Sequence, residues 1–223
     1  MTVLLVALTL AIFILIDYLM NRKRVSVVDP RPACSSNQIL KARPESVSGI
    51  RLPGNIRFHP GHTWALRESP TLVRVGIDDL AARMIGRAES ILLPKRGQWI
   101  RQGQKIFSIF RDGTRAELVS PIEGEVTSVN EAVIKSPILL NSDPYGDGWL
   151  LAVMSPDAET NFRNLLGGDL ARQWMAEEES RLSGKTQATT TVAAQDDGIE
   201  TGNLSLSVSG QSWTDLTREF FLI

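Results

Sequence analysis

Two histidines, His59 and His62, are the residues whose type and spacing first suggest chemistry. Imidazoles three residues apart share one face of a helix, where both could bind a single metal ion. The intervening Pro60-Gly61 breaks a helix, however, and no third ligand is apparent in the sequence. We therefore expect the two histidines to be packed or hydrogen-bonded within the fold, with no metal site.

Carboxylates are the next candidates for chemistry. Asp143, Asp147, Glu123 and Glu125 fall in predicted turns or on strand surfaces, without an arrangement that would pair an acid with a base. The sequence also has no G-x-S-x-G, P-loop or dinucleotide-binding fingerprint. We predict no catalytic residue, no enzymatic activity and no small-molecule substrate.

The charged residues are balanced overall but unevenly distributed. The 223 residues include 24 Lys and Arg against 25 Asp and Glu, which argues against a general nucleic-acid binder. The net charge is +5 over residues 1–60, zero over 61–155 and −6 over 156–223. The neutral middle is therefore the candidate packed domain. The single cysteine, Cys34, excludes a disulfide framework and is expected to be inert.

An apolar run at the start of the chain is long enough to cross a bilayer. Residues 2–20 read TVLLVALTLAIFILIDYLM, with Asp17 as the only charge, and at about 1.5 Å per residue such a helix spans the hydrocarbon core. No basic side chain precedes it and no small-residue cleavage site follows, which favours a retained anchor over a signal peptide. Three basic residues follow the run directly: Arg22, Lys23 and Arg24. We expect them to contact lipid headgroups and to orient the rest of the chain toward the cytoplasm. The sequence thus predicts a single-pass protein of the inner or cytoplasmic membrane.

The rest of the chain divides by composition. After a transmembrane anchor over residues 1–21, residues 22–51 combine basic residues with prolines and serines, which predicts a linker. Residues 52–183 carry the regular apolar patterns of a folded domain. Residues 184–210 are polar and low in complexity, which predicts disorder, and 211–223 form a short amphipathic helix.

Short segments separated by glycine and proline dominate the middle of the chain. Apolar residues alternate over 71–77, which predicts a half-buried strand. Asp78 and Asp79 can cap a short helix that stops at Gly86. Later predicted strands lie within 89–94, 99–100, 105–110, 116–121 and 124–129. Strands this close together favour an antiparallel sandwich or barrel, because no helix-length segment is available for parallel crossovers.

Turn and helix signals follow. The tight-turn cluster DPYGDGW feeds a last strand over 149–154. Ser155 is expected to cap a helix that breaks at Gly167-Gly168, and Asp169 to cap a second helix that reaches Leu182.

The final segment, WTDLTREFFLI, differs from the polar stretch before it. Trp213, Leu216, Phe220 and Phe221 would form one apolar face of a short helix. That face is a candidate partner-binding surface, and docking on its own domain is equally compatible with the pattern.

Several motifs in consistent order and spacing resemble the H protein of the glycine cleavage system, a member of the lipoyl-domain superfamily. They are HTW (62–64), VRVGIDDLAARMIG (73–86), LP (93–94), QG (102–103), SPIEGEVTSVN (120–130) and SPILLNSDPYGDGWL (136–150). The resemblance covers roughly residues 55–180. It implies a mainly β fold, a flattened lipoyl/biotinyl-type β-barrel sandwich of two small sheets with peripheral helices. It also implies a lipoyl arm that carries an aminomethyl group and electrons among the glycine-cleaving enzymes.

The resemblance implies that lipoate is attached to a lysine at a hairpin tip, in a motif like E-S-V-K-A, eight residues before the proline matching Pro121. Counting back from Pro121 without insertion or deletion gives Gly113, in the segment Arg111, Asp112, Gly113, Thr114. Asp-Gly favours a two-residue type I′ turn, so the hairpin is kept while the amine is missing.

No nearby residue replaces that amine. Arg111 and Arg115 are always protonated and are poor nucleophiles. Lys95 and Lys105 lie elsewhere in the pattern, in a turn and at a strand start. We expect no bound cofactor.

Together these features predict a membrane-tethered, H-protein-like module that is not lipoylated and acts as an interaction or assembly subunit for unidentified proteins. One alternative is a lipoyl carrier of glycine cleavage with lipoate on another lysine. Another is an accessory subunit of a membrane electron-transfer or transport complex, with Asp17 as a helix contact.

Overall fold

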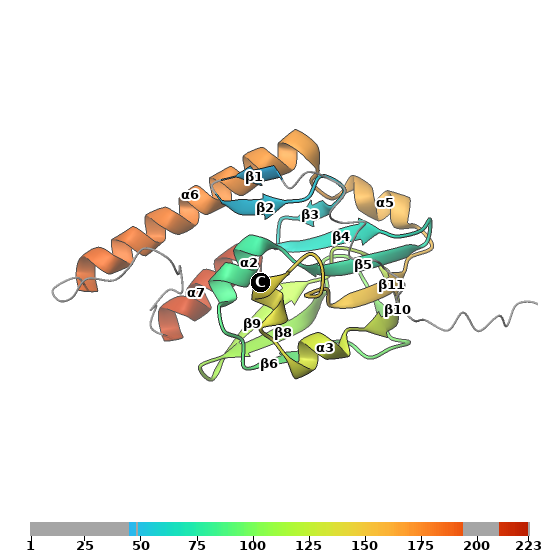
Figure 1. The fold of residues 1–223 in the computed structure, drawn as a ribbon, viewed down its shortest axis with the longest axis horizontal. Coiled ribbons are helices and arrows are strands. Elements are labelled where there is room, and N and C mark those ends of the chain that lie inside the picture. Colours follow the sequence, from blue (N-terminus) through green and yellow to red (C-terminus); the bar gives the residue numbers. More distant parts are fainter. Residues whose placement is uncertain (1–44, 48, 194–209, 223) are drawn as a thin grey trace, which may run out of the picture. The chain divides into compact units, whose positions relative to one another are not determined.

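The computed structural model describes residues 45–47, 49–193 and 210–222 (Figure 1). The predicted membrane segment 2–20, the basic residues 22–24 and Cys34 lie outside the described residues. Among the helices within these ranges, none has both the length and the apolarity that a bilayer span requires.

The described chain is built mainly from short antiparallel strands. A six-stranded sheet has the order β3-β4-β5-β11-β10-β7, a three-stranded sheet the order β6-β8-β9, and β1 pairs with β2 alone. The strands are β1 Glu45–Val47, β2 Ile50–Leu52, β3 Arg57–His59, β4 Thr63–Arg67, β5 Leu72–Ile77, β6 Ser90–Leu92, β7 Trp99–Ile100, β8 Lys105–Arg111, β9 Thr114–Val119, β10 Gly124–Val129 and β11 Leu151–Met154. The predicted antiparallel two-sheet sandwich is confirmed.

One hydrophobic cluster joins the two larger sheets. Val75 and Val153 contribute from the six-stranded sheet, and Phe107 and Leu118 from the three-stranded sheet, all with no exposed surface. The burial of these apolar side chains away from water is the main favourable contribution to the stability of a small sandwich.

Helices surround the sandwich. They are α2 Asp79–Ile85, α3 Glu131–Lys135, α4 Leu139–Ser142, α5 Ala158–Arg163, α6 Gly168–Ala193 and α7 Gly210–Phe220. Asp78 caps α2 as predicted, because its side chain accepts a hydrogen bond from the Ala81 N–H, and Gly86 ends the helix with φ +63°. A residue without a Cβ adopts that conformation most easily. Asp79, the other predicted cap, is instead the first residue of the helix.

The folded part starts earlier than the sequence suggested. The composition predicts a linker over residues 45–51, but Glu45 pairs with Leu52 and Val47 with Ile50 in the β1–β2 hairpin. Each strand has only three residues, too few for a visible period of two.

The strand predicted over 71–77 is found at that position as β5, but it is more deeply buried than predicted. β5 was expected to be half-buried, yet both of its faces are covered. On the outward face, the Arg74 guanidinium lies 2.5 Å from Glu68 and 5.2 Å from the Trp149 ring, so this arginine is buried with a charge partner and an aromatic partner.

The C-terminal helices also differ from the expectation. Ser155 does not cap α5; its N–H donates to the Thr71 carbonyl and continues the sheet, and Asp157 takes the cap position. α6 starts at Gly168, with Asp169 inside its first turn, and continues to Ala193, although disorder was predicted from residue 184. A helix already nucleated extends at little further cost.

Gly76 is required where β4 and β5 pack most closely. A Cβ at this position would lie 2.6 Å from Cζ2 of Trp64. Trp64 is fully buried, and its Nε1 donates to the Ile77 carbonyl at 2.7 Å and to the Pro144 carbonyl at 3.2 Å, so the indole has no room to move.

We therefore expect Gly76→Ala to lower the free energy of unfolding by about 1–3 kcal/mol through overpacking. Urea unfolding of the full-length chain in detergent measures this. Gly54→Ala is the matched control, because a Cβ there meets no described atom within 4 Å. Equal destabilisation by the two substitutions would contradict the packing argument.

Candidate functional site

The β8–β9 hairpin ends in the turn where the sequence resemblance places the lipoyl attachment point. Asp112 and Gly113 have φ values of +49° and +71°, and Arg111 pairs with Thr114 across the turn. This is the type I′ turn that the Asp-Gly pair predicts. A Cβ on Gly113 would meet no described atom within 4 Å, so the tip faces solvent.

Arg111 fixes the base of this hairpin to the end of α2. Its Nη1 donates to the carbonyl oxygens of Ile85 at 3.1 Å and Met84 at 3.5 Å, and its Nε donates to Asp112 at 3.1 Å. Its Cζ also lies 5.9 Å from the ring centroid of Trp213. The last carbonyls of a helix carry partial negative charge, so a cation is favoured there. Arg111 therefore acts as a structural clamp.

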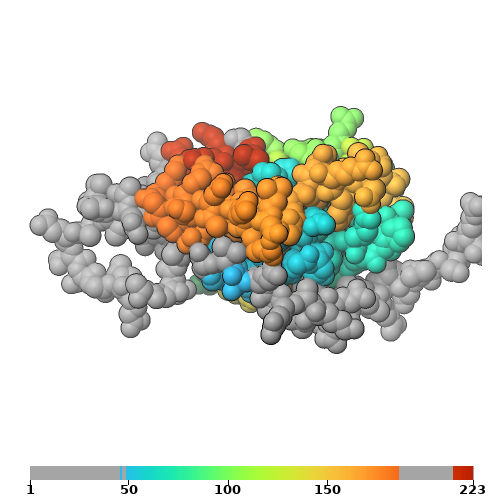
Figure 2. Space-filling view, turned by 90° about the horizontal axis from the view of Figure 1, so that it is seen from above, coloured from blue at the N-terminus to red at the C-terminus, as the bar shows by residue number. Residues whose placement is uncertain are grey.

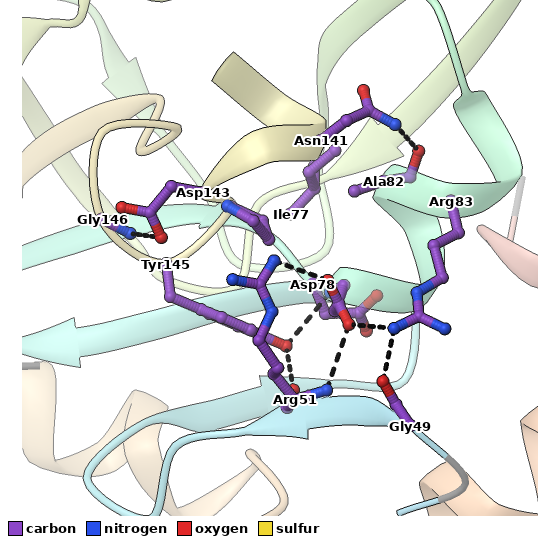
Figure 3. A network of polar contacts seen from close by, with 12 residues as sticks. Gly49, Arg51, Ile77, Asp78, Ala82, Arg83, Asn141, Asp143, Tyr145 and Gly146 are labelled. Carbon is purple, nitrogen blue, oxygen red and sulfur yellow. Dashed lines mark hydrogen bonds and ion pairs between the residues drawn. The ribbon is translucent and has the colours of Figure 1, made fainter. Parts of the chain in front are cut away.

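A polar network holds α2 against β2 (Figure 3). The Asp79 carboxylate accepts hydrogen bonds from the Arg51 backbone N–H at 3.1 Å, from the Arg51 side chain at 2.9 Å and from Arg83 at 2.9 Å. The Tyr145 hydroxyl accepts from the Asp79 N–H at 3.1 Å and donates to the Arg51 carbonyl at 2.8 Å. Burial, helped by the negative charge of Asp78, raises the pKa of Tyr145 well above its usual value. The hydroxyl thus stays a donor, and α2 is held in place.

The two histidines have the packed roles expected from the sequence. His62 Nδ1 lies 2.8 Å from the Asp78 carboxylate, and both side chains are fully buried. The His62 ring lies 4.9 Å from Trp174 of α6, and its Nε2 has no partner among the described residues. His59 Nδ1 accepts from the Gly61 N–H, and burial together with nearby His62 lowers the pKa of His59. The described residues bring no three potential ligands together for a metal ion.

The candidate carboxylates are not brought together. Asp143 accepts hydrogen bonds from the backbone N–H groups of Gly146 at 3.2 Å and Asp147 at 3.1 Å, which fixes the turn before β11. Glu125 is exposed on β10 opposite Trp99 of β7, and Glu123 is half-buried at the start of β10. These positions give a structural role to Asp143 and surface positions to the others.

α7 docks on its own domain. Trp213, Phe220 and Phe221 retain 3%, 2% and 0% of their surface, while Leu216 is half-buried. The Trp213 Nε1–H donates to the Met84 carbonyl at 3.2 Å, which places it beside the Arg111 clamp. Of the two arrangements that the sequence left open, the described structure has docking in cis. The four candidate partner-binding residues could face a partner only if α7 were released.

Ion pairs join α7 to α6, and the two helices lie side by side (Figure 2). Glu219 accepts hydrogen bonds from Arg181 at 2.9 Å and from Lys185. The Lys185 ammonium and the Arg181 guanidinium lower the pKa of Glu219. All three side chains are partly exposed, so these pairs orient α7 more than they stabilise it.

A polar hollow of about 660 Å³ lies beside the hairpin. Its lining residues are Arg87, Ala88, Glu89, Arg111 and Asp112. Opposite charges are mixed in this lining, so it presents hydrogen-bonding groups without a strong preference for either sign of charge.

The hairpin is predictable from the sequence, but the contacts that support it are not. The clamp by Arg111 and the network around Asp79 join residues distant in the chain, which no local period reveals. The one available signal was Gly86, because a helix end leaves carbonyl oxygens free for a cation.

These features define the class of this protein: a small antiparallel β-sandwich domain that presents a tight, rigidly supported hairpin to solvent. The family model described as glycine cleavage H-protein matches residues 56–178. The chain therefore belongs to the glycine cleavage H-protein family.

Two relatives and one solved structure are similar to this chain. A probable glycine cleavage system H protein 2 from Saccharolobus solfataricus is 32% identical over 133 residues, which cover 58% of this chain and 89% of the relative. The glycine cleavage system H protein of Legionella pneumophila is 36% identical over 124 residues, covering 56% and 98%. The crystal structure of a glycine cleavage system H protein from Mycobacterium marinum shares 25% identity, with a TM-score of 0.48, and covers 57% of this chain and 99% of that one.

The docking of α7 can be tested with two adjacent residues. Phe221→Ala removes a fully buried ring, which typically costs about 3–5 kcal/mol, and should release α7. Leu222→Ala changes a side chain that is 58% exposed and should leave α7 docked. Hydrogen exchange of the full-length chain, followed by mass spectrometry, should show faster exchange in α7 and β9 for the first variant only. The same protection in both variants would contradict docking.

Proposed function

We propose that this chain is a membrane-tethered member of the H-protein family that is not lipoylated and acts as an interaction or assembly subunit. The observation that carries the proposal is Gly113 at the tip of the β8–β9 hairpin, in a two-residue turn with φ +71°. Lipoate is attached through an amide bond to an amine, and glycine has no side-chain amine to acylate. The chain then has no carrier chemistry of its own and no catalytic role.

Other lysines are poorly placed to substitute. Those in the described residues are Lys95, Lys105, Lys135 and Lys185. Lys105 lies 3.5 Å from Glu117 at the start of β8, and Lys135 lies 3.7 Å from Glu131 on α3. Each is on a different element from the turn at 112–113, so none would give a lipoyl arm the same position.

The hairpin itself is suited to binding a protein. The Asp112 side chain is 75% exposed, while the base of the hairpin is held by Arg111. A surface that is already ordered loses little conformational freedom when a partner binds. The hairpin and the adjacent polar hollow are therefore the proposed contact surface.

The tether is inferred from the apolar residues 2–20 and the basic residues 22–24. A span followed by cations orients the remaining chain toward the cytoplasm. The module would then act at the cytoplasmic face of the inner or cytoplasmic membrane, next to partners in or on that membrane.

The missing amine gives a direct test by intact mass. The wild-type chain, expressed in a host that lipoylates its own carrier proteins, should show no lipoyl increment. Gly113→Lys should gain one, because it restores an amine at the tip of a preserved hairpin; a side chain at φ +71° costs about 1 kcal/mol, which the fold can tolerate. A lipoyl increment on the wild-type chain would favour the carrier alternative. No increment on the variant would contradict the assigned register.

The interaction role is tested by photo-cross-linking in intact cells. A benzoylphenylalanine residue replaces Asp112 at the hairpin, and Glu131 on α3 serves as the control because its side chain is 80% exposed. We expect a defined cross-linked protein from position 112 and none from position 131. Failure to trap any protein at 112, with the chain folded and abundant, would count against an interaction surface at the hairpin.

A further inference from the structure

A second surface of the domain, formed by Lys95, Arg96, Trp99 and Arg101, combines exposed cations with an exposed indole. We call it the basic-aromatic turn. Trp99 is 51% exposed, whereas the other four tryptophans of the sequence are buried or half-buried. Tryptophan is highly buried on average, so a half-exposed indole leaves a large apolar area in contact with water.

The turn is ordered, so Trp99 is held outward by the backbone. The Gly97 N–H donates to the Val126 carbonyl at 2.7 Å, and the Val126 N–H donates to the Gln98 carbonyl at 2.9 Å. Ile100 points into the core with no exposed surface. Side chains alternate along a strand, so Trp99 and Arg101 both face away from the core.

The apolar surface extends beyond the indole. Glu125 of β10 pairs with Trp99 on one side and with Met154 of β11 on the other, so all three side chains project from the same face of the sheet. Met154 is 48% exposed. Two exposed apolar side chains thus flank one carboxylate, on the face that carries the turn.

The three cations of the basic-aromatic turn are available for a ligand. Among the described residues, Lys95, Arg96 and Arg101 make no ion pair with a carboxylate, and all three are exposed. By contrast, Arg111 and Arg115 on the β8–β9 hairpin lie close to Asp112 and Glu117.

We infer that the basic-aromatic turn contacts the anionic headgroups of a lipid bilayer. Lysine and arginine attract such headgroups, and tryptophan prefers the boundary between headgroups and acyl chains, so the two residue types together match that surface. The bilayer is favoured over an acidic protein because exposed apolar side chains, Trp99 and Met154, lie on the face that carries the cations, and a bilayer interface takes up both kinds of side chain. This step depends on the tether in the proposed function.

Fluorescence of the full-length chain in vesicles provides the test. The vesicles contain phosphatidylcholine alone or mixed with phosphatidylglycerol, and some lipids carry bromine on their acyl chains. Bromine quenches an indole that enters the interface. The contribution of Trp99 is the difference between the wild-type chain and Trp99→Phe. We expect quenching of Trp99 in the mixed vesicles, and clearly less in phosphatidylcholine or at high salt.

Charge variants of the turn sharpen the test. The combined variant K95Q/R96Q/R101Q should reduce quenching in mixed vesicles, since each cation near an anionic surface contributes about fivefold in partitioning. The variant K135Q/R163Q/R218Q removes the same charge from exposed positions elsewhere and should quench like the wild type. Glu125→Gln removes the carboxylate beside Trp99 and should increase quenching, measured as the difference between E125Q and E125Q/W99F so that only Trp99 contributes.

The outcomes separate the inference from the tether. Resistance of the vesicle-bound chain to alkaline extraction reports membrane insertion independently. An inserted chain whose Trp99 is quenched equally in both kinds of vesicle, or not at all, would overturn the inference and leave the tether intact. Protection of Trp99 from iodide by polyglutamate in detergent, without quenching in anionic vesicles, would also overturn it, in favour of an acidic protein. Loss of the chain on alkaline extraction would instead overturn the tether.

Discussion

The buried Asp78 carboxylate is the interaction on which the surroundings of the hairpin depend. It accepts a hydrogen bond from the Ala81 N–H at 2.8 Å, starting α2, and from His62 Nδ1 at 2.8 Å. A carboxylate without exposed surface is tolerated only when its oxygens are satisfied in this way. The other end of α2 supplies the carbonyl oxygens that hold Arg111, so a contact at one end of a seven-residue helix sets the position of a hairpin at the other.

Turn geometry and chemical function are separable at the hairpin. The two-residue turn needs positive φ at both of its central residues, and Asp112 and Gly113 satisfy this without any contribution from a lysine. The sheet register around the turn depends on backbone pairing and on inward residues such as Ile109 and Ala116, which are fully buried. A family member can therefore lose the amine at this position and keep the fold, which is the physical basis for proposing an interaction role.

Local signals were sufficient for much of the sandwich and insufficient for its connections. The strands from β5 to β11 and the two ends of α2 followed from alternation, from glycine and proline punctuation, and from single residues such as Asp78 and Gly86, whereas β1 to β4 were not predicted. Three-residue strands and the short α3 and α4 fall below the length at which a period can be read. The continuation of α6 past residue 184 was missed because a polar composition indicates solvation, whereas Lys185 pairs with Glu219 of a helix far along the chain. The hairpin turn was predictable from two adjacent residues, but the clamp by Arg111 depends on contacts across 26 and 27 residues.

The amphipathic pattern of α7 had two possible readings because an apolar helix face must be covered by something, and the pattern does not say by what. The sheet topology explains why the domain itself provides the cover. β9 is an edge of the three-stranded sheet, and an exposed edge can pair with other chains. α7 lies against β9, with Phe221 and Trp213 buried at the two ends of the contact. This contact covers both the edge of β9 and the apolar face of α7. The hairpin tip extends beyond this cover and stays accessible, so the proposed contact surface is open while α7 remains docked.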